Sequence, residues 1–130
     1  MQDSIFTKII KGEIPSHKVY EDEKTLAFMD IHPITEGHVL VIPKVQVEFV
    51  WDLDDEYYHA VMETSKKVAI RLREVSGKPY VYERIVGTDV PHAHVQLMPF
   101  TDTSEVHRPQ DLASEPDHEA LASLAEKLRF

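Results

Sequence analysis

A long stretch with helical periodicity lies between short runs of strand-forming residues, and this arrangement constrains the fold more than any other feature. Between Asp54 and Val75, apolar residues recur every three or four positions, as on one face of an amphipathic helix. Asp54 can cap the start of this helix, and Gly77 can end it. The face comprises Tyr58, Val61, Met62, Ser65, Val68, Ala69, Leu72 and Val75. Such a helix buries its apolar face against a sheet, so the pattern predicts an α+β fold.

The flanking runs predict the strands of an antiparallel sheet. β-Branched and aromatic residues bounded by turn-forming residues are typical of strands. The expected strands cover residues 19–21, 25–29, 38–43, 79–86 and 91–99. A short N-terminal helix is expected over residues 5–11, and a C-terminal helix over about residues 116–128, with Ser114 and Asp117 as its capping pair.

Length and composition predict one domain with a short C-terminal appendage. The 130 residues are enough for a single hydrophobic core. No apolar run approaches the roughly 20 residues that a membrane-spanning helix needs. The first six residues lack the basic start and the apolar stretch of a secretory signal. We therefore expect a cytoplasmic protein that does not associate with membranes.

Net charge and cysteine content limit which ligands the protein can bind and which side chains can react. The formal net charge of −9 opposes binding to a nucleic-acid polymer, because such binding depends on Lys and Arg neutralising phosphates. A few local donors can still hold one small anionic ligand. The sequence has no cysteine, so thiolate nucleophiles and cysteine-ligated zinc are excluded. Eight histidines and the carboxylates remain as reactive side chains.

The segment from Pro91 to Pro99 holds the most informative residues. Side chains alternate along a strand, so His92, His94 and Gln96 are expected on one face, about 7 Å apart. Such a row can serve as nucleophile, general acid or base, or metal ligand. A metal site would need a further ligand such as Asp89 or Asp102, and no cysteine or HExxH pattern supplies the rest, so no metal and no cofactor are expected. A lone histidine on a sheet face is more often an ordinary polar residue.

The segment 92–99, His-Ala-His-Val-Gln-Leu-Met-Pro, resembles the signature of the histidine triad (HIT) superfamily in a variant with glutamine at the third position. Three upstream blocks match the same family in order. They are Ile5-Phe6 with Lys11-Gly12-Glu13-Ile14-Pro15, then Leu26-Ala27-Phe28-Met29-Asp30-Ile31, and then Gly37-His38-Val39-Leu40-Val41-Ile42-Pro43-Lys44. The resemblance implies a HIT-like fold with a five-stranded antiparallel sheet and one long helix, usually in a homodimer. It also implies a catalytic nucleotide-binding part over residues 1–105, with 106–130 as a helical tail of the same domain.

The resemblance implies a reaction as well. In HIT enzymes the middle histidine, here His94, attacks the α-phosphorus of a nucleoside phosphate derivative and forms a nucleotidyl-histidine intermediate. His92 would lie beside the phosphate and orient the relay. His92, Gln96 and the backbone N–H groups near Gly87 and Thr88 would donate to the phosphate. Asp89 stands near the phosphate, where many relatives have serine, and would repel an anion unless it turned away or paired with Arg84 or Lys44.

The first helix and second strand would form the purine and ribose pocket. Its expected apolar walls are Ile5, Phe6, Ile9, Phe28 and Ile31. Asp30 would bind the ribose hydroxyls. Each assignment has an alternative, since Phe28 and Ile31 also suit the core and Asp30 also suits a local turn cap.

Gln96 leaves three functions open. Glutamine cannot release a proton to a basic leaving group such as an amine. The first interpretation is a HIT-type hydrolase acting on a purine nucleotide derivative, either a phosphoramidate or a dinucleoside polyphosphate. The second is a nucleotidyltransferase or phosphorylase that uses the same intermediate. The third is a non-catalytic nucleotide-binding interaction protein whose acidic segment 111–119 recruits a partner.

A further departure from the family pattern is Gln46, which replaces a histidine that often follows the Pro-Lys pair.

Overall fold

The structure, a computed structural model, describes residues 2–130 and confirms the α+β fold. Five antiparallel strands form one sheet in the order β1-β2-β3-β5-β4. The elements are α1 (Ile5–Ile10), β1 (Lys18–Glu21), β2 (Thr25–Met29), β3 (Val39–Pro43), α2 (Asp55–Ser76), β4 (Tyr80–Arg84), β5 (Val95–Phe100) and α3 (His118–Leu128), with 3-10 turns at Val50–Asp52 and Thr103–Glu105. Within residues 2–130, no helix combines the length and the apolar character needed to cross a membrane.

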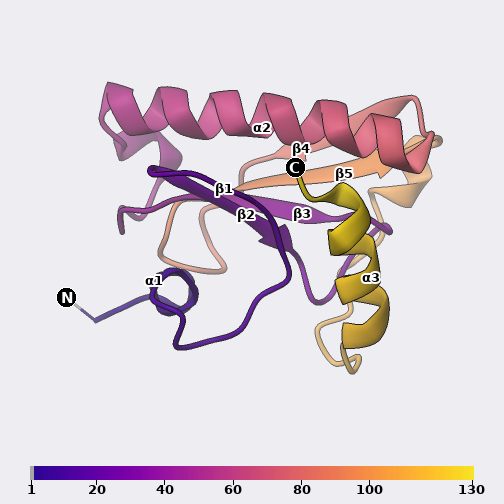
Figure 1. The fold of residues 1–130 in the computed structure, drawn as a ribbon, viewed down its shortest axis with the longest axis horizontal. Helices are drawn as coiled ribbons and strands as arrows, with labels where there is room; N and C mark the ends of the chain where they lie inside the picture. The colour runs from indigo at the N-terminus through magenta and orange to yellow at the C-terminus, as the bar shows by residue number, and fades with distance from the viewer. Residues whose placement is uncertain (1) are drawn as a thin grey trace.

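The long helix α2 covers one face of the sheet (Figure 1). Its predicted caps are confirmed: the Asp54 carboxylate accepts from the backbone N–H of Tyr57, and Gly77 is left-handed with φ 71°. The helix buries Val61, Val68 and Leu72. These side chains share a core with the inward-facing strand residues Ala27, Met29, Val39, Val41, Val95 and Leu97.

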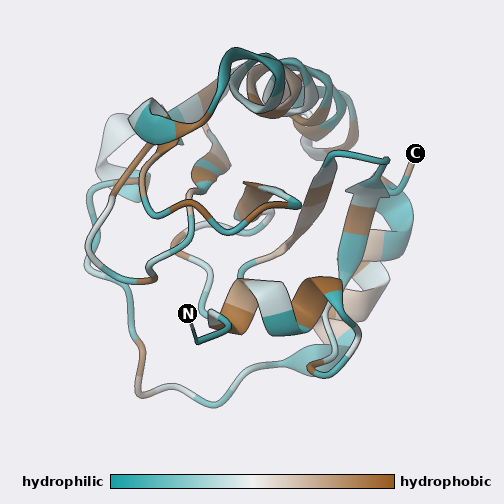
Figure 2. Cartoon of the chain, turned by 90° about the vertical axis from the view of Figure 1, so that its left-hand side faces the viewer, coloured by the Kyte–Doolittle hydropathy of each residue, from teal (hydrophilic) through white to brown (hydrophobic). Residues whose placement is uncertain are grey.

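The short helix α1 lies against the opposite face, so the sheet sits between two helical layers (Figures 1 and 2). Its buried Phe6 and Ile9 pack with strand residues Leu26, Phe28, Leu40 and Ile42. This second core is smaller than the α2 core, and α1 covers only part of its face. The uncovered part is where the candidate site lies.

Strand pairing places four side chains in one row across the α1 face. Phe28 of β2 pairs with Leu40 of β3, which pairs with Gln96 of β5, which pairs with Arg84 of β4. The row runs from an apolar end to a charged end because residues in register across a sheet point to the same side. Gln96 therefore sits between an apolar wall and a cation.

Several boundaries differ from the sequence prediction: β4 covers Tyr80–Arg84 instead of 79–86, and α3 begins at His118 instead of about residue 116. The strand expected over residues 91–99 begins only at Val95, because the backbone N–H groups of His92 and Ala93 bond to loop carbonyls of Val90 and Val47. The predicted pair Ser114 and Asp117 does not form. Asp117 alone caps α3 by accepting from Ala120 N–H, while the Ser114 hydroxyl donates to the Asp111 carbonyl.

The C-terminal tail shares the core of the sheet. Leu121, Ala125 and Leu128 of α3 are buried with the α2-side residues. Arg71 on α2 donates to the carbonyls of Lys127 and Leu128, which fastens the end of α3. Helix α3 therefore packs on the α2 side of the sheet.

Candidate active site

A cavity of about 610 Å³ opens on the α1 face of the sheet. Helix α1, the end of β2 and the loop 88–90 contribute its walls, together with His94, which directly precedes β5, and Gln96, which lies in β5. All eight residues proposed for nucleotide binding line it: Ile5, Phe6, Ile9, Phe28, Asp30, Ile31, Thr88 and Asp89. Of the three proposed catalytic residues, His94 and Gln96 line it and His92 does not.

His94 is oriented by a backbone carbonyl. Its Nδ1 lies 2.8 Å from the carbonyl oxygen of His92. Because that oxygen only accepts, Nδ1 carries a proton, and in the neutral ring the lone pair is on Nε2. The Phe6 ring packs edge-on against the imidazole, with centroids 5.2 Å apart. The His94 ring is therefore fixed on two sides, in the tautomer whose Nε2 is free to attack when the ring is neutral.

His92 is placed differently from the expectation that it lies beside the phosphate. Its side chain is fully buried behind His94, and its Nε2 donates to the Pro43 carbonyl over 2.9 Å. Its Nδ1 accepts from the Ser4 hydroxyl over 2.8 Å. Burial lowers the pKa of His92, and the nearby His94 acts in the same direction, against the Pro43 hydrogen bond. The residue positions His94 through its own carbonyl and has no face on the cavity.

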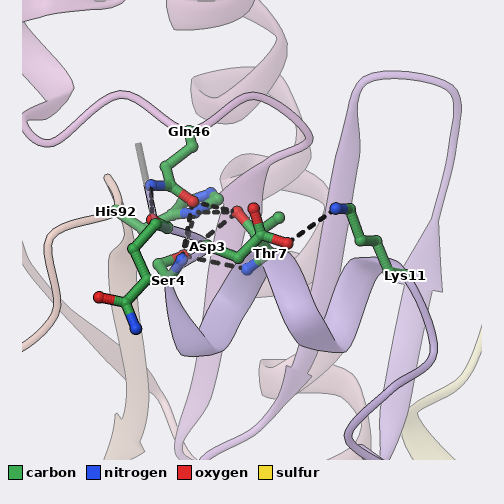
Figure 3. A network of polar contacts seen from close by, with 7 residues as sticks. Asp3, Ser4, Thr7, Lys11, Gln46 and His92 are labelled. Atoms are coloured by element: carbon green, nitrogen blue, oxygen red, sulfur yellow. Dashed lines mark hydrogen bonds and ion pairs between the residues drawn. The ribbon is translucent and has the colours of Figure 1, made fainter.

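The N-terminus of α1 is tied to the histidine segment by a polar network (Figure 3). Ser4 caps α1 by accepting from Thr7 N–H and donates to His92. The Gln46 side-chain oxygen accepts from the Ser4 backbone N–H at 2.8 Å and from the Thr7 hydroxyl at 2.6 Å. The Gln46 amide nitrogen donates to the Gln2 carbonyl. Gln46, which replaces a common histidine, thus joins helix α1 to the segment after β3.

The side-chain oxygen of Gln96 accepts hydrogen bonds from two residues. Its side-chain oxygen accepts from Nε and Nη2 of Arg84, at 3.2 and 3.1 Å, and from Nε2 of His38, at 2.9 Å. His38 must be protonated at Nε2, because its Nδ1 accepts from the Ile34 backbone N–H. The amide orientation of Gln96 is therefore determined: its oxygen faces Arg84 and His38, and its Nε2 is the donor left for a ligand.

Asp30 makes the local turn contact that the sequence left open. Its Oδ1 accepts from the His32 backbone N–H at 2.8 Å, as in an Asx turn. Both carboxylate oxygens also accept from the Gln110 side chain at 3.1 Å. The carboxylate lies at the cavity wall and is held from two directions.

Asp89 has neither of the partners expected for it. Lys44 forms an ion pair with Glu21 at 2.8 Å, and Arg84 donates to Gln96. Asp89 is exposed on the loop before the histidine segment. The Asp89 carboxylate is therefore screened by solvent and is not balanced by either of these two cations.

Known proteins are similar to this chain in sequence and in fold. A family model described as the HIT domain matches residues 11–103. The chain belongs to the HIT family. It is 41% identical over 106 residues to an uncharacterized HIT-like protein of Borreliella burgdorferi, covering 76% of each chain. It is 38% identical over 134 residues to a protein of Candida albicans named adenosine 5'-monophosphoramidase, covering 96% of this chain and 88% of that one.

A solved structure supports the same family assignment. A HIT-like protein of Bartonella henselae, described as involved in cell-cycle regulation, superposes with a TM-score of 0.82 and 31% identity. The match covers 98% of this chain and 95% of that one. The described sheet and its three helices thus follow the HIT fold over nearly the whole chain.

Several cavity residues of this HIT protein were not predicted from the sequence. They are Ile14, Pro15, Ser16, Met29, His32, Leu40, Val90, Gln110 and Leu112. Leu40 lies inside a predicted strand and pairs with Phe28, so strand pairing was a usable signal for it. Gln110 and Leu112 lie beyond the HIT domain match, in a segment with no local periodicity. Within residues 2–130, no group of three or more His, Cys, Asp or Glu side chains converges to hold a metal ion.

Proposed function

We propose that this HIT protein is a nucleotide hydrolase in which Nε2 of His94 attacks the α-phosphorus of a purine nucleoside phosphate derivative. The observation that carries the proposal is the 2.8 Å contact from His94 Nδ1 to the His92 carbonyl. This contact keeps the proton on Nδ1 and leaves the lone pair of Nε2 at the cavity. A ring held in one tautomer reacts without first rearranging its protons.

The proposed reaction has two displacements. In the first, a bond forms between Nε2 and phosphorus, and the bond from phosphorus to the leaving group breaks with its electron pair on the leaving atom. In the second, the oxygen of water bonds to the same phosphorus and loses a proton to solvent, while the bond from phosphorus to Nε2 breaks with its electron pair returning to Nε2 and the nucleoside monophosphate is released. His94 is regenerated with its Nδ1 proton in place. Dividing one hard displacement into two easier ones is the advantage of covalent catalysis.

The cavity supports a nucleotide as the ligand. Its apolar walls, Phe6 and Ile9 from α1 and Phe28 from β2, suit a flat base. Asp30 offers carboxylate oxygens for ribose hydroxyls at the same wall. Thr88 and its neighbours in the loop offer backbone donors near His94. The relative named adenosine 5'-monophosphoramidase favours a purine and a hydrolytic reaction.

Gln96 favours a second candidate, transfer of the nucleotidyl group to phosphate or to a sugar phosphate. Glutamine has no proton to release at neutral pH, so a leaving group that departs as a stable anion is served better than an amine. In a transferase or phosphorylase, the group that leaves phosphorus is such an anion in the forward reaction and in the reverse reaction. The intermediate on His94 is the same in both candidates.

We also propose that the protein forms a homodimer through β4 and α2. Strand β4 is at the edge of the sheet and leaves backbone groups unpaired on its outer side. Beside it, a hollow of about 560 Å³ is lined by Ile70 and Arg73 of α2, Tyr80 of β4 and Phe100 of β5. Ile70 and Tyr80 are exposed apolar side chains. A Tyr80→Glu variant that remained dimeric by light scattering would argue against this surface.

Mass spectrometry of the protein quenched during turnover tests the function. Adenosine 5'-phosphoramidate and diadenosine tetraphosphate are the substrates, with and without added phosphate. We expect a mass increase of one adenylyl group on His94, lost in His94→Ala together with turnover. His59→Ala, which changes an exposed histidine on α2, is the control. AMP release in water alone supports hydrolysis, and a phosphate-dependent product supports transfer. AMP binding with no adduct would make the protein a non-catalytic binding module.

A further inference from the structure

Arg84 makes two hydrogen bonds to Gln96, yet it does not line the cavity. The two residues are register partners on β4 and β5, and Nε and Nη2 of the guanidinium both donate to the same amide oxygen. Gln96 is 3% exposed, so this contact lies in a region where water competes weakly. Arg84 therefore acts on the cavity through Gln96.

His38 completes the arrangement from the other side. It is fully buried, and its Nε2–H donates to the same oxygen at 2.9 Å. Burial lowers the pKa of His38 and keeps the ring neutral, with the charge on Arg84 acting in the same direction and Asp30 and Gln96 opposing. A cation and a neutral donor thus share one acceptor. Any residue at position 96 must offer an acceptor to both.

Building on the proposed function, we infer that Arg84 is a positioning residue that makes Gln96 a fixed, polarised hydrogen-bond donor and so restricts the reaction to acidic leaving groups. A cation on the amide oxygen draws electron density from the amide and strengthens donation from Nε2. A phosphate or nucleoside polyphosphate leaves as an anion, with the electron pair of the broken bond on its oxygen, and accepts that bond. Ammonia or an amine must gain a proton as it leaves, and the amide cannot release one.

The same geometry governs what a histidine at position 96 could do. Such a ring would have to accept from Arg84 and His38 with one nitrogen, and it would face the guanidinium charge. A neighbouring cation disfavours the protonated form of an imidazole, so the ring would remain a poor general acid. The glutamine and the arginine therefore belong together, and replacing the glutamine alone does not create a general acid.

A double-mutant cycle tests this pairing. The variants are Arg84→Met, Gln96→His and the double variant, with kcat/KM measured on diadenosine tetraphosphate and on adenosine 5'-phosphoramidate. We expect Arg84→Met to lower kcat/KM for the tetraphosphate about tenfold or more, with Arg84→Lys recovering part of the loss. We expect the double variant to turn over the phosphoramidate about tenfold or more faster than Gln96→His alone.

The pH profile separates this role from a structural one. In the double variant, phosphoramidate turnover should fall as pH rises through the histidine range, because the acid at position 96 is then lost. Arg129→Met, which removes an exposed guanidinium at the far end of α3, is the control and should leave both substrates unaffected.

Two outcomes would overturn the inference while leaving the proposed function intact. One is Gln96→His matching the double variant on the phosphoramidate. The other is Arg84→Met and Arg84→Lys both retaining the wild-type ratio between the two substrates while the His94 adduct still forms. If wild-type protein forms no adduct with either substrate, the proposed function fails and this role fails with it.

Discussion

The side-chain amide of Gln110 donates to both carboxylate oxygens of Asp30, at 3.1 Å each. The same nitrogen also lies 2.8 Å from the His32 carbonyl, so the tail is fastened across the turn after β2. Gln110 is outside the segment that matches the HIT domain, which ends at residue 103. The tail therefore supplies one of the groups that orient the proposed ribose-binding carboxylate.

Replacing Gln110 should weaken nucleotide binding through Asp30. Without the amide, the carboxylate loses a hydrogen bond worth about 0.5–1.5 kcal/mol, which corresponds to a fall in AMP affinity of about two- to tenfold. Calorimetric titration of Gln110→Ala with AMP checks this. The internal control is 2',3'-dideoxy-AMP, which has no hydroxyl for Asp30 and should bind wild type and variant equally. An equal loss for both ligands would show that the effect does not pass through the ribose.

Ser4 has two roles that a single substitution removes together. Its hydroxyl oxygen caps α1 through Thr7 N–H, and its hydroxyl proton goes to His92 Nδ1. The Thr7 hydroxyl lies farther from this nitrogen, at 3.3 Å, and its proton is donated to Gln46 at 2.6 Å. Ser4→Ala should therefore cost about 1 kcal/mol for the cap and about 1–3 kcal/mol for the buried acceptor left unpaired.

The matched control for Ser4 is Asp54→Ala. Asp54 caps α2 in the same way, but at an exposed position with no buried histidine behind it. Urea unfolding should show a loss of about 1 kcal/mol for Asp54→Ala and a clearly larger loss for Ser4→Ala. Equal losses would mean that the Ser4 contact to His92 contributes nothing to the free energy of unfolding.

Two buried histidines make the stability depend on pH in a defined direction. Burial lowers the pKa of both His38 and His92 from the ordinary value of 6.5. Below that value the unfolded chain takes up protons that the native state does not bind, so the free energy of unfolding falls as pH falls. Each group contributes at most about 1.4 kcal/mol per pH unit in this window.

Urea unfolding at intervals between pH 8 and pH 5 measures this slope. The stability gained from the neutral rings should be fully present above pH 6.5. His92→Gln should reduce the slope, while His59→Gln, at an exposed position on α2, serves as the control. A free energy of unfolding that stays constant from pH 7 to pH 5 would contradict both assignments.

The sequence predicted the elements well because their signals are local. Helix α2 shows its periodicity and both caps within one stretch, and β3 is a β-branched run ended by Pro43. Strand alternation also predicted that His94 and Gln96 share a face, and both line the cavity. It misplaced His92, because alternation was extended through a segment whose backbone bonds to Val47 and Val90 instead of a neighbouring strand.

The remaining features of the site depend on contacts between distant residues. Arg84 reaches Gln96 only through strand register, and His38 reaches it from a loop 58 positions away. Gln110 approaches Asp30 across 80 positions. No period or motif marks such residues in the sequence, and their side chains acquire a role only when the sheet brings them together.

Gly37 provides the last prediction, because it sits directly before His38 in a conformation that favours glycine. Its φ is 94°, and a Cβ there would lie 3.0 Å from Pro99 Cγ. Gly12 is a matched control, with φ 80° and no heavy atom within 4 Å of where a Cβ would lie. Gly12→Ala should cost about 1–2 kcal/mol for the left-handed backbone alone.

Gly37→Ala should cost that amount and about 1–3 kcal/mol more for crowding, because Pro99 is buried in β5 and has little room to shift. Displacing residue 37 also moves His38 relative to Gln96, so turnover of diadenosine tetraphosphate should fall in Gly37→Ala and not in Gly12→Ala. Urea unfolding and steady-state kinetics on the two variants measure both effects. If Gly37→Ala were no less stable than Gly12→Ala, the close packing against Pro99 would not be a constraint on the fold.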